Sequence, residues 1–92
     1  MAYQLVFTES YLKRAKKFAK RHPELRNLYQ KTLLLLEQNP FHPSLRLHPL
    51  TGNLNGLHSI SINLSYRITI DLLIDDETII FINVGSHDEI YR

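Results

Sequence analysis

Three segments in the second half of the chain have the alternating pattern of half-buried β-strands. They span residues 57–64, 66–74 and 78–84, and only a few polar residues separate each segment from the next. Because connections this short join antiparallel neighbours, the pattern predicts a meander of hairpins. A sheet with one apolar face must pack that face against another layer, so the rest of the chain has to supply a cover.

The alternation also predicts which side chains share a face of this sheet. The apolar set is expected to face the core: Ile60, Ile62, Leu64, Tyr66, Ile68, Ile70, Leu72, Ile80, Ile82 and Val84. The opposite parity is expected to gather polar residues on a face open to water: Ser59, Ser61, Arg67 and Asn83. Since a guanidinium recognises carboxylate and phosphate groups, this face is the first place to look for a binding site.

The cover is predicted to be two amphipathic helices that follow a short strand over residues 3–7. Thr8 can cap the first helix. The apolar side chains of this helix recur at spacings of three and four residues: Tyr11, Leu12, Ala15, Phe18 and Ala19. Pro23 begins the second helix, which ends at residues 39–40. The buried stripe of the second helix has the same spacing: Leu25, Leu28, Tyr29, Thr32, Leu33 and Leu36.

Residues 41–56 are rich in Pro, Asn and Gly and predict a loop with a short strand near residues 45–47. A chain of 92 residues has room for one small core. We therefore predict a single domain over residues 1–92 of the α+β class. In it, an N-terminal strand and a two-helix hairpin pack on one face of a mainly antiparallel β-sheet.

The charges divide the chain into two parts. The whole chain has a formal charge of only +2. Residues 1–67 hold ten Lys and Arg against three Glu, a net +7, whereas residues 68–92 hold one Arg against six acids, a net −5. Much of the positive charge lies on the outer face of the first predicted helix: Lys13, Arg14, Lys16, Lys17, Lys20 and Arg21. Such a stripe fits either a polyanionic partner or an ordinary solvated face.

Several kinds of site are excluded by what the sequence lacks. Without cysteine there is no disulfide, thiol nucleophile or Cys-based zinc site. The spacing of the histidines matches no metal-ligand pair, and Gly85-Ser86-His87 lacks the second glycine of a serine-hydrolase elbow. No apolar run approaches the roughly 20 residues of a membrane span. The residues before the first helix lack a signal-peptide core, so we expect a cytoplasmic protein. From the missing motifs we also expect no metal and no cofactor.

What remains is an arginine on the predicted open face with titratable groups near its rim. His48 lies in the loop before the sheet, and His87 follows the last strand. RNA cleavage by the neighbouring 2′-hydroxyl group needs a base, a cation and an acid, and it needs no metal. The same residues allow another interpretation, because Arg67 can equally pair with Asp71 on its own face.

Four short motifs follow one another along the chain: Leu47-His48-Pro49-Leu50, Gly52-Asn53-Leu54-Asn55-Gly56-Leu57, Ser65-Tyr66-Arg67-Ile68 and Val84-Gly85-Ser86-His87-Asp88-Glu89-Ile90-Tyr91-Arg92. In this order and spacing they resemble the RelE/ParE superfamily of toxins from type II toxin-antitoxin modules. The resemblance is strongest to RelE-type mRNA interferases, and to their YafQ-like branch. It implies a metal-independent endoribonuclease that cuts mRNA on the ribosome by 2′-hydroxyl attack and inhibits translation.

The resemblance also implies roles for single residues. Arg67 matches the arginine that stabilises the scissile phosphate, and His87 matches a proposed general acid. His48 matches a histidine of the His-Pro-Leu loop, and Tyr91 matches a C-terminal aromatic that stacks on a base or assists proton transfer. Further residues are expected to contact RNA: Lys13, Lys16, Lys17, Lys20, Arg46, Ser61, Tyr66 and Asn83. The implied partners are a cognate antitoxin protein, mRNA and the ribosomal A site.

Three positions depart from the pattern of this branch. Ser61 stands where the branch has a histidine, Asn83 stands where an arginine is common, and Ser65-Tyr66 replaces an Asp-Trp pair. Two other interpretations therefore stay open: a ParE-like inhibitor of DNA gyrase without nuclease activity, and an inactive relic that only binds its antitoxin. The fold hosts all three, so the site must decide between them. The two histidines and the C-terminal tyrosine favour the nuclease, since a gyrase inhibitor does not need them.

Overall fold

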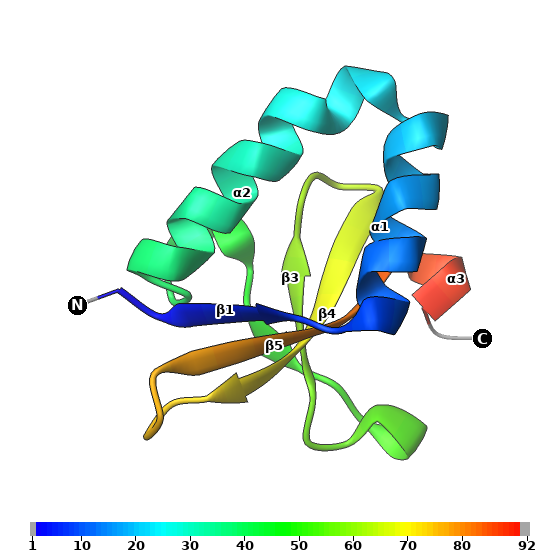
Figure 1. Ribbon diagram of the computed structural model, residues 1–92. Coiled ribbons are helices and arrows are strands. Elements are labelled where there is room, and N and C mark those ends of the chain that lie inside the picture. Colours follow the sequence, from blue (N-terminus) through cyan, green and yellow to red (C-terminus); the bar gives the residue numbers. More distant parts are fainter. Residues whose placement is uncertain (1, 91–92) are drawn as a thin grey trace.

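The computed structural model describes residues 2–90 and contains a five-stranded sheet with two long helices on one of its faces (Figure 1). The elements follow in this order: β1 (Gln4–Phe7), α1 (Glu9–Arg21), η1 (Pro23–Leu25), α2 (Arg26–Gln38), η2 (Pro43–Leu45), β2 (His48–Pro49), η3 (Gly52–Leu54), β3 (His58–Ser61), β4 (Tyr66–Leu73), β5 (Thr78–Ser86) and α3 (His87–Ile90). The three η elements are single 3₁₀ turns. The predicted α+β class, with its N-terminal strand and helical hairpin, is confirmed.

The strand order across the sheet is β1-β5-β4-β3-β2, and only the β1–β5 pair is parallel. The prediction of a mainly antiparallel sheet is confirmed. β1 pairs with Thr78–Phe81, which is only the first half of β5. On the side of β5 where β1 lies, no strand within residues 2–90 pairs with residues 82–86. We call this stretch the open edge of β5.

Helices α1 and α2 meet the sheet in one apolar core. α1 begins after Thr8, whose Oγ1 accepts a hydrogen bond from the Tyr11 N–H at 3.2 Å. The Tyr11 ring lies 5.1 Å from the Phe81 ring on β5, and its hydroxyl oxygen lies 2.8 Å from that of Tyr29 on α2. The buried residues of this core are Tyr11, Phe18, Leu36, Leu45, Ile60, Ile62, Ile68, Ile70, Ile79, Phe81 and Val84.

The two tyrosine hydroxyls predict a loss of stability in alkaline solution. Burial raises the pKa of Tyr11 well above its ordinary value of 10.0, and burial also raises the pKa of Tyr29. The folded state therefore favours neutral phenols, a contribution that is complete below the unfolded pKa and is lost as pH rises from there towards the folded pKa. In urea titrations between about pH 9 and 11, Tyr11→Phe should lose less unfolding free energy than the wild type. Tyr3→Phe is the control. Equal losses of unfolding free energy in the wild type and in Tyr11→Phe would contradict this account.

A β-bulge in β5 changes which of its side chains face the core. Ile82 is the extra residue at the bulge, where the pairing with β4 shifts by one position. The prediction that Ile80 and Ile82 face the core is therefore wrong, and Ile79 and Phe81 are fully buried instead. Beyond the bulge the predicted parity returns, and Val84 is buried.

Two local predictions before the sheet are corrected as well. The short strand predicted near residues 45–47 lies further along the chain, at His48–Pro49. Leu45 ends a 3₁₀ turn, and Arg46 has a φ of 50°, which interrupts an extended backbone. Leu64 was expected in the core but is 76% exposed, because β3 ends at Ser61 and Leu64 lies in the turn that follows.

Candidate functional site

Two rows of paired residues cross the sheet on the face opposite α1 and α2. The first row crosses β2, β3, β4 and β5: His48, Ser59, Thr69 and Asn83. The second row crosses β3, β4 and β5: Ser61, Arg67 and Gly85. Paired residues have their side chains on the same face, so four of the predicted site residues share one side of the sheet. We call these two rows the polar face.

Arg67 is the cation of the polar face. Its Nη1 donates a hydrogen bond to Ser61 Oγ at 3.0 Å, which ties the guanidinium to the neighbouring strand. The Arg67 Nε is buried and has no hydrogen-bond partner within the described residues, and the same holds for Ser59 Oγ and Thr69 Oγ1. Within the described residues, no ion pair joins Arg67 to Asp71. Buried polar atoms normally have partners, so these three atoms are exceptions that single out this part of the sheet.

The polar face is less open to water than the sequence predicts. Ser59 is fully buried and Ser61 is only 7% exposed, so the expectation of an open position is wrong for both. Both residues lie on β3, an inner strand between β2 and β4, and Ser61 also accepts the hydrogen bond from Arg67. His48, Arg67 and Asn83 are half-buried, and a ligand would meet these three side chains first.

His48 has the geometry of a proton acceptor. Its Nδ1 lies 3.0 Å from the backbone carbonyl oxygen of Arg46, an atom that can only accept a hydrogen bond. In the neutral imidazole, Nδ1 then carries the proton of this contact and Nε2 is the atom with the lone pair. The Arg46 side chain itself is exposed, so this predicted RNA contact lies at the surface close to His48.

Helix α3 places His87 beside the polar face. His87 begins α3 only two residues after Gly85 of the second row, and Ile90 at the other end of α3 is buried. The His87 side chain is 65% exposed, and its Nδ1 lies 3.7 Å from a carboxylate oxygen of Asp88. Tyr91, the predicted C-terminal aromatic, lies outside the described residues.

Tyr66 is not brought together with the polar face. It lies one position before Arg67 on β4, so its side chain points to the side that the helices cover. The Tyr66 ring is 4.4 Å from the His22 ring and 5.4 Å from the Phe18 ring. This predicted RNA contact therefore lies in an aromatic cluster beneath α1.

A cleft of about 340 Å³ lies between α1 and the open edge of β5. Its walls come from both elements and from α3: Arg14, Lys17, Phe18, Arg21, His22, Asn83, Val84, Gly85 and Glu89. Lys17 and Asn83 were predicted as RNA contacts and both line this cleft, so Asn83 lies at the edge where the polar face meets the cleft. Arg14 and Arg21 belong to the predicted basic stripe but were not among the predicted RNA contacts. Their spacing from Lys17, three and four residues, is the signal that places all three on one side of α1.

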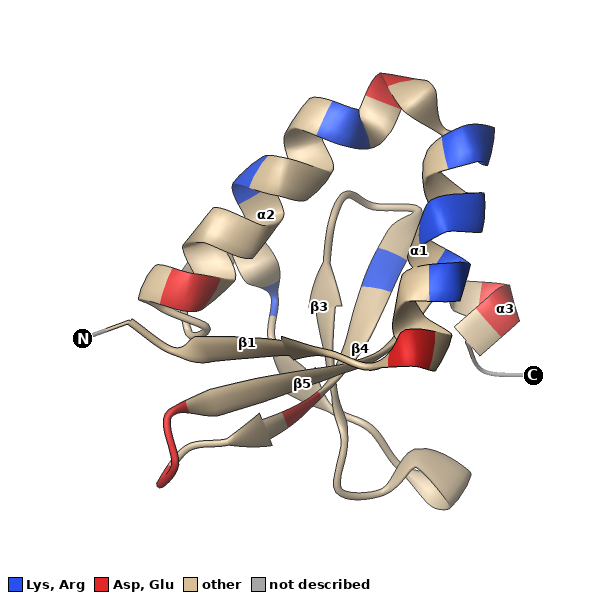
Figure 2. Ribbon diagram, in the orientation of Figure 1, with Lys and Arg blue, Asp and Glu red and all other residues tan. Residues whose placement is uncertain are grey.

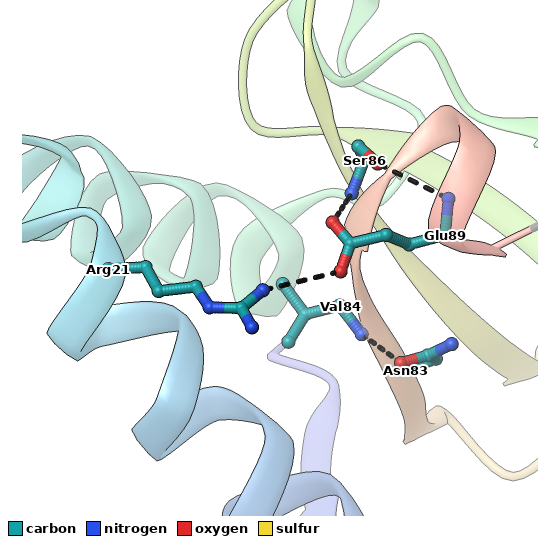
Figure 3. Close-up of polar contacts among 5 residues, drawn as sticks. All are labelled: Arg21, Asn83, Val84, Ser86 and Glu89. Carbon is teal, nitrogen blue, oxygen red and sulfur yellow. Dashed lines mark hydrogen bonds and ion pairs between the residues drawn. The ribbon is translucent and has the colours of Figure 1, made fainter.

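Along the open edge, side-chain oxygens accept hydrogen bonds from backbone N–H groups (Figure 3). The Val84 N–H donates to Asn83 Oδ1 at 2.8 Å. The Ser86 N–H donates to Glu89 Oε1 at 3.0 Å, and Glu89 Oε2 lies 3.8 Å from Arg21 Nη1. The hydrogen bond from the Ser86 N–H lowers the pKa of Glu89 below its ordinary value. An ionised carboxylate therefore lies between the end of α1 and the end of β5.

The remaining predicted RNA contacts form an exposed basic surface on α1. The lysines are Lys13, Lys16, Lys17 and Lys20, and Figure 2 shows this side of the molecule marked by Lys and Arg. The acidic turn between β4 and β5, which carries Asp75, Asp76 and Glu77, lies away from it in the same view. The basic surface and the acidic turn thus lie apart, whereas Asp88 and Glu89 of the same acidic segment lie on α3, near the end of α1.

Across residues 2–90, no three His, Asp or Glu side chains come together as a group that could hold a metal ion. In the same part of the chain, no helix combines the length and the apolar character that crossing a membrane requires.

Comparison with known proteins gives a family match and several similar folds. Residues 3–92 match the family described as "Bacterial toxin of type II toxin-antitoxin system, YafQ". A YafQ mutant from E. coli superposes with a TM-score of 0.82 at 22% identity, over 98% of this chain and 99% of that one. The E. coli DinJ-YafQ toxin-antitoxin complex gives a TM-score of 0.79 at 19% identity, over 100% of both chains. A YoeB/ParE toxin from Agrobacterium tumefaciens gives 0.72 at 20% identity, over 91% of this chain and 98% of that one.

No curated protein sequence matches the chain. At identities near 20%, the similar structures show the fold alone. The family match covers nearly all of the chain, including the polar face, the cleft and α3.

Proposed function

Because the chain belongs to the YafQ family of bacterial toxins from type II toxin-antitoxin systems, we propose that it is a metal-independent endoribonuclease that cleaves mRNA on the ribosome. The observation that carries the proposal is the environment of Arg67. This guanidinium is tied to Ser61, has a buried Nε without a partner among residues 2–90, and shares its face with His48. Attack by a 2′-hydroxyl group requires a cation and a proton acceptor, and these two residues on one face of the sheet can supply them.

The proposed reaction assigns one task to each side chain. His48 Nε2 takes the proton of the 2′-hydroxyl group, and the resulting oxygen forms a bond to phosphorus. Arg67 donates hydrogen bonds to the non-bridging oxygens as their negative charge increases. His87 gives a proton to the departing 5′-oxygen as the P–O bond breaks. The products are a 2′,3′-cyclic phosphate and a 5′-hydroxyl end.

The proposal includes two macromolecular partners. The lysines of α1 are suited to the phosphates of ribosomal RNA, with the polar face turned towards mRNA in the A site. A cognate antitoxin is the second partner, and the DinJ-YafQ complex, in which a toxin of the same fold is bound to an antitoxin, supports it. Toxin and antitoxin would be made in the cytoplasm, where the ribosome is.

The test uses the purified chain with translating ribosomes and a defined mRNA. Primer extension should reveal discrete cuts that appear with time, need no divalent metal beyond what the ribosome requires, and are absent when ribosomes are omitted. Supercoiling by DNA gyrase, assayed in parallel, should be unaffected. Intact mRNA at stoichiometric protein would overturn the proposal, and inhibited supercoiling would favour a ParE-like inhibitor.

The lysine surface of α1 should set how strongly ribosome binding depends on salt. Each phosphate contact contributes roughly 0.7–0.9 to the slope of log K against log [salt]. Replacing Lys13, Lys16, Lys17 and Lys20 by glutamine should therefore reduce this slope by about 3. Lys31→Gln on α2, an exposed lysine outside this surface, is the matched control. A slope that stays the same in the fourfold variant would show that α1 does not meet RNA.

A further inference from the structure

Glu89 and Ser86 form a reciprocal capping box at the start of α3. The Glu89 N–H donates to Ser86 Oγ at 3.2 Å, while the Ser86 N–H donates to Glu89 Oε1 at 3.0 Å. A helix of only four residues gains little from its own hydrogen bonds, so its geometry depends on such end contacts. The two hydrogen bonds thus determine how the chain turns from β5 into α3.

The same carboxylate connects α3 to two other parts of the molecule. Glu89 Oε2 faces Arg21 at the end of α1, with 3.8 Å between the charged atoms. Below it, Gly85 leaves the space that the Glu89 side chain occupies, because a Cβ atom at Gly85 would lie 3.3 Å from Glu89 Cβ. Ile90, the next residue, is buried. Glu89 is therefore held from several sides although its side chain is half exposed.

The residue that this arrangement orients is His87. It lies between Ser86 and Glu89, so both hydrogen bonds of the capping box close around it. Its own side chain is exposed, and the fixed backbone of α3 sets the direction in which the imidazole leaves the chain. We propose that Glu89 is a positioning residue, which through the Ser86–Glu89 capping box holds His87 at the distance from the polar face that proton transfer needs.

This inference rests on the proposed function for its consequence in catalysis, but its geometric part can be tested separately. Glu89→Ala removes the acceptor for the Ser86 N–H, whereas Glu89→Gln keeps an oxygen in the same place. Misplacing a catalytic group by about 1 Å can cost up to about 100-fold in rate. We expect Glu89→Ala to lower kcat about tenfold with KM for ribosomes within about twofold, and Glu89→Gln to restore most of kcat.

Two further variants separate positioning from general stability. Ser86→Ala removes the other half of the capping box and should lower kcat as Glu89→Ala does, while Ser86→Thr should restore it. Glu9→Ala removes a glutamate from the first turn of α1, away from the polar face, and should leave kcat unchanged. Circular dichroism at the assay temperature must show each variant folded. A kcat loss that only follows the unfolded fraction would overturn the inference.

A measurement without substrate completes the test. Scalar couplings of His87 report whether its χ1 angle has one value or an average, and hydrogen exchange reports protection of the Ser86 amide. In the wild type and in Glu89→Gln we expect a protected amide and a single His87 rotamer, and in Glu89→Ala we expect both to be lost. If the wild type fails to cut mRNA, the proposed function is wrong while these couplings still decide the positioning. Unchanged couplings in Glu89→Ala would refute it.

Discussion

Replacing Arg67 by alanine is expected to slow mRNA cleavage by about 10²–10³-fold, mostly in kcat. The negative charge on the phosphate oxygens is largest in the pentacoordinate transition state, so the guanidinium stabilises that state more than the bound substrate. The Ser61 hydrogen bond fixes this cation beforehand, and no reorganisation is needed during the reaction. Single-turnover cleavage on programmed ribosomes, quantified by primer extension, measures the loss directly.

Two other substitutions make this result specific. Arg67→Lys keeps the charge, but a single ammonium cannot bind Ser61 and the phosphate with the geometry of a guanidinium, so we expect an intermediate loss of about tenfold. Arg26→Ala removes an exposed arginine at the start of α2 and should cleave like the wild type. If Arg67→Ala stayed within about threefold of the wild type while remaining folded, the role of Arg67 in the transition state would be refuted.

Loss of His87 is expected to slow cleavage by about 10²–10⁴-fold, the usual contribution of a general acid. The leaving 5′-oxygen is a poor leaving group unless it receives a proton as the bond breaks. A substrate in which sulfur replaces this bridging oxygen leaves readily without protonation. His87→Ala should therefore cut the sulfur-containing mRNA almost as fast as the wild type does.

The sulfur substrate also separates the three proposed roles. Arg67→Ala and His48→Ala should remain slow on it, because the phosphate oxygens still need the cation and the 2′-hydroxyl group still needs a base. The same assay run on the natural linkage gives the reference for each variant. Rescue of His48→Ala by sulfur, and not of His87→Ala, would exchange the roles of the two histidines.

The sequence predicted the parts of the fold that depend on regular periodicity. The cap at Thr8 is confirmed, and so is the burial of Ile60, Ile62, Ile68 and Ile70 in the predicted strands and of Tyr11 and Phe18 in α1. The prediction is wrong for Leu12 of the α1 stripe, which is 53% exposed, and for Leu64 after β3. The inner half of β5 has no such pattern, because four successive residues, Ile79 to Ile82, are apolar. Either parity then satisfies the core, and the pairing with β4 decides in favour of Ile79 and Phe81.

The candidate site was predictable to a similar extent. Strand parity placed Ser61, Arg67 and Asn83 on one face, and the register confirms that they share it. The contact between His48 and the Arg46 carbonyl depends on the positive φ of Arg46, which the spacing of apolar residues does not predict. The role of Glu89 was missed although Ser86 and Glu89 have the three-residue spacing of a capping box, because no helix was expected after β5. The stacking proposed for Tyr91 stays a prediction.

The bulge at Ile82 shifts the alternation of side chains between the two parts of β5. Before the bulge Ile79 and Phe81 face the core, and after it Val84 faces the core while Asn83 and Gly85 pair with residues of the polar face. Ile79 and Phe81 lie in the core before the bulge, whereas Gly85 and the turn into α3 lie after it. The unpaired Ile82 therefore separates the part of β5 that pairs with β1 from the part that pairs with Arg67 and leads into α3.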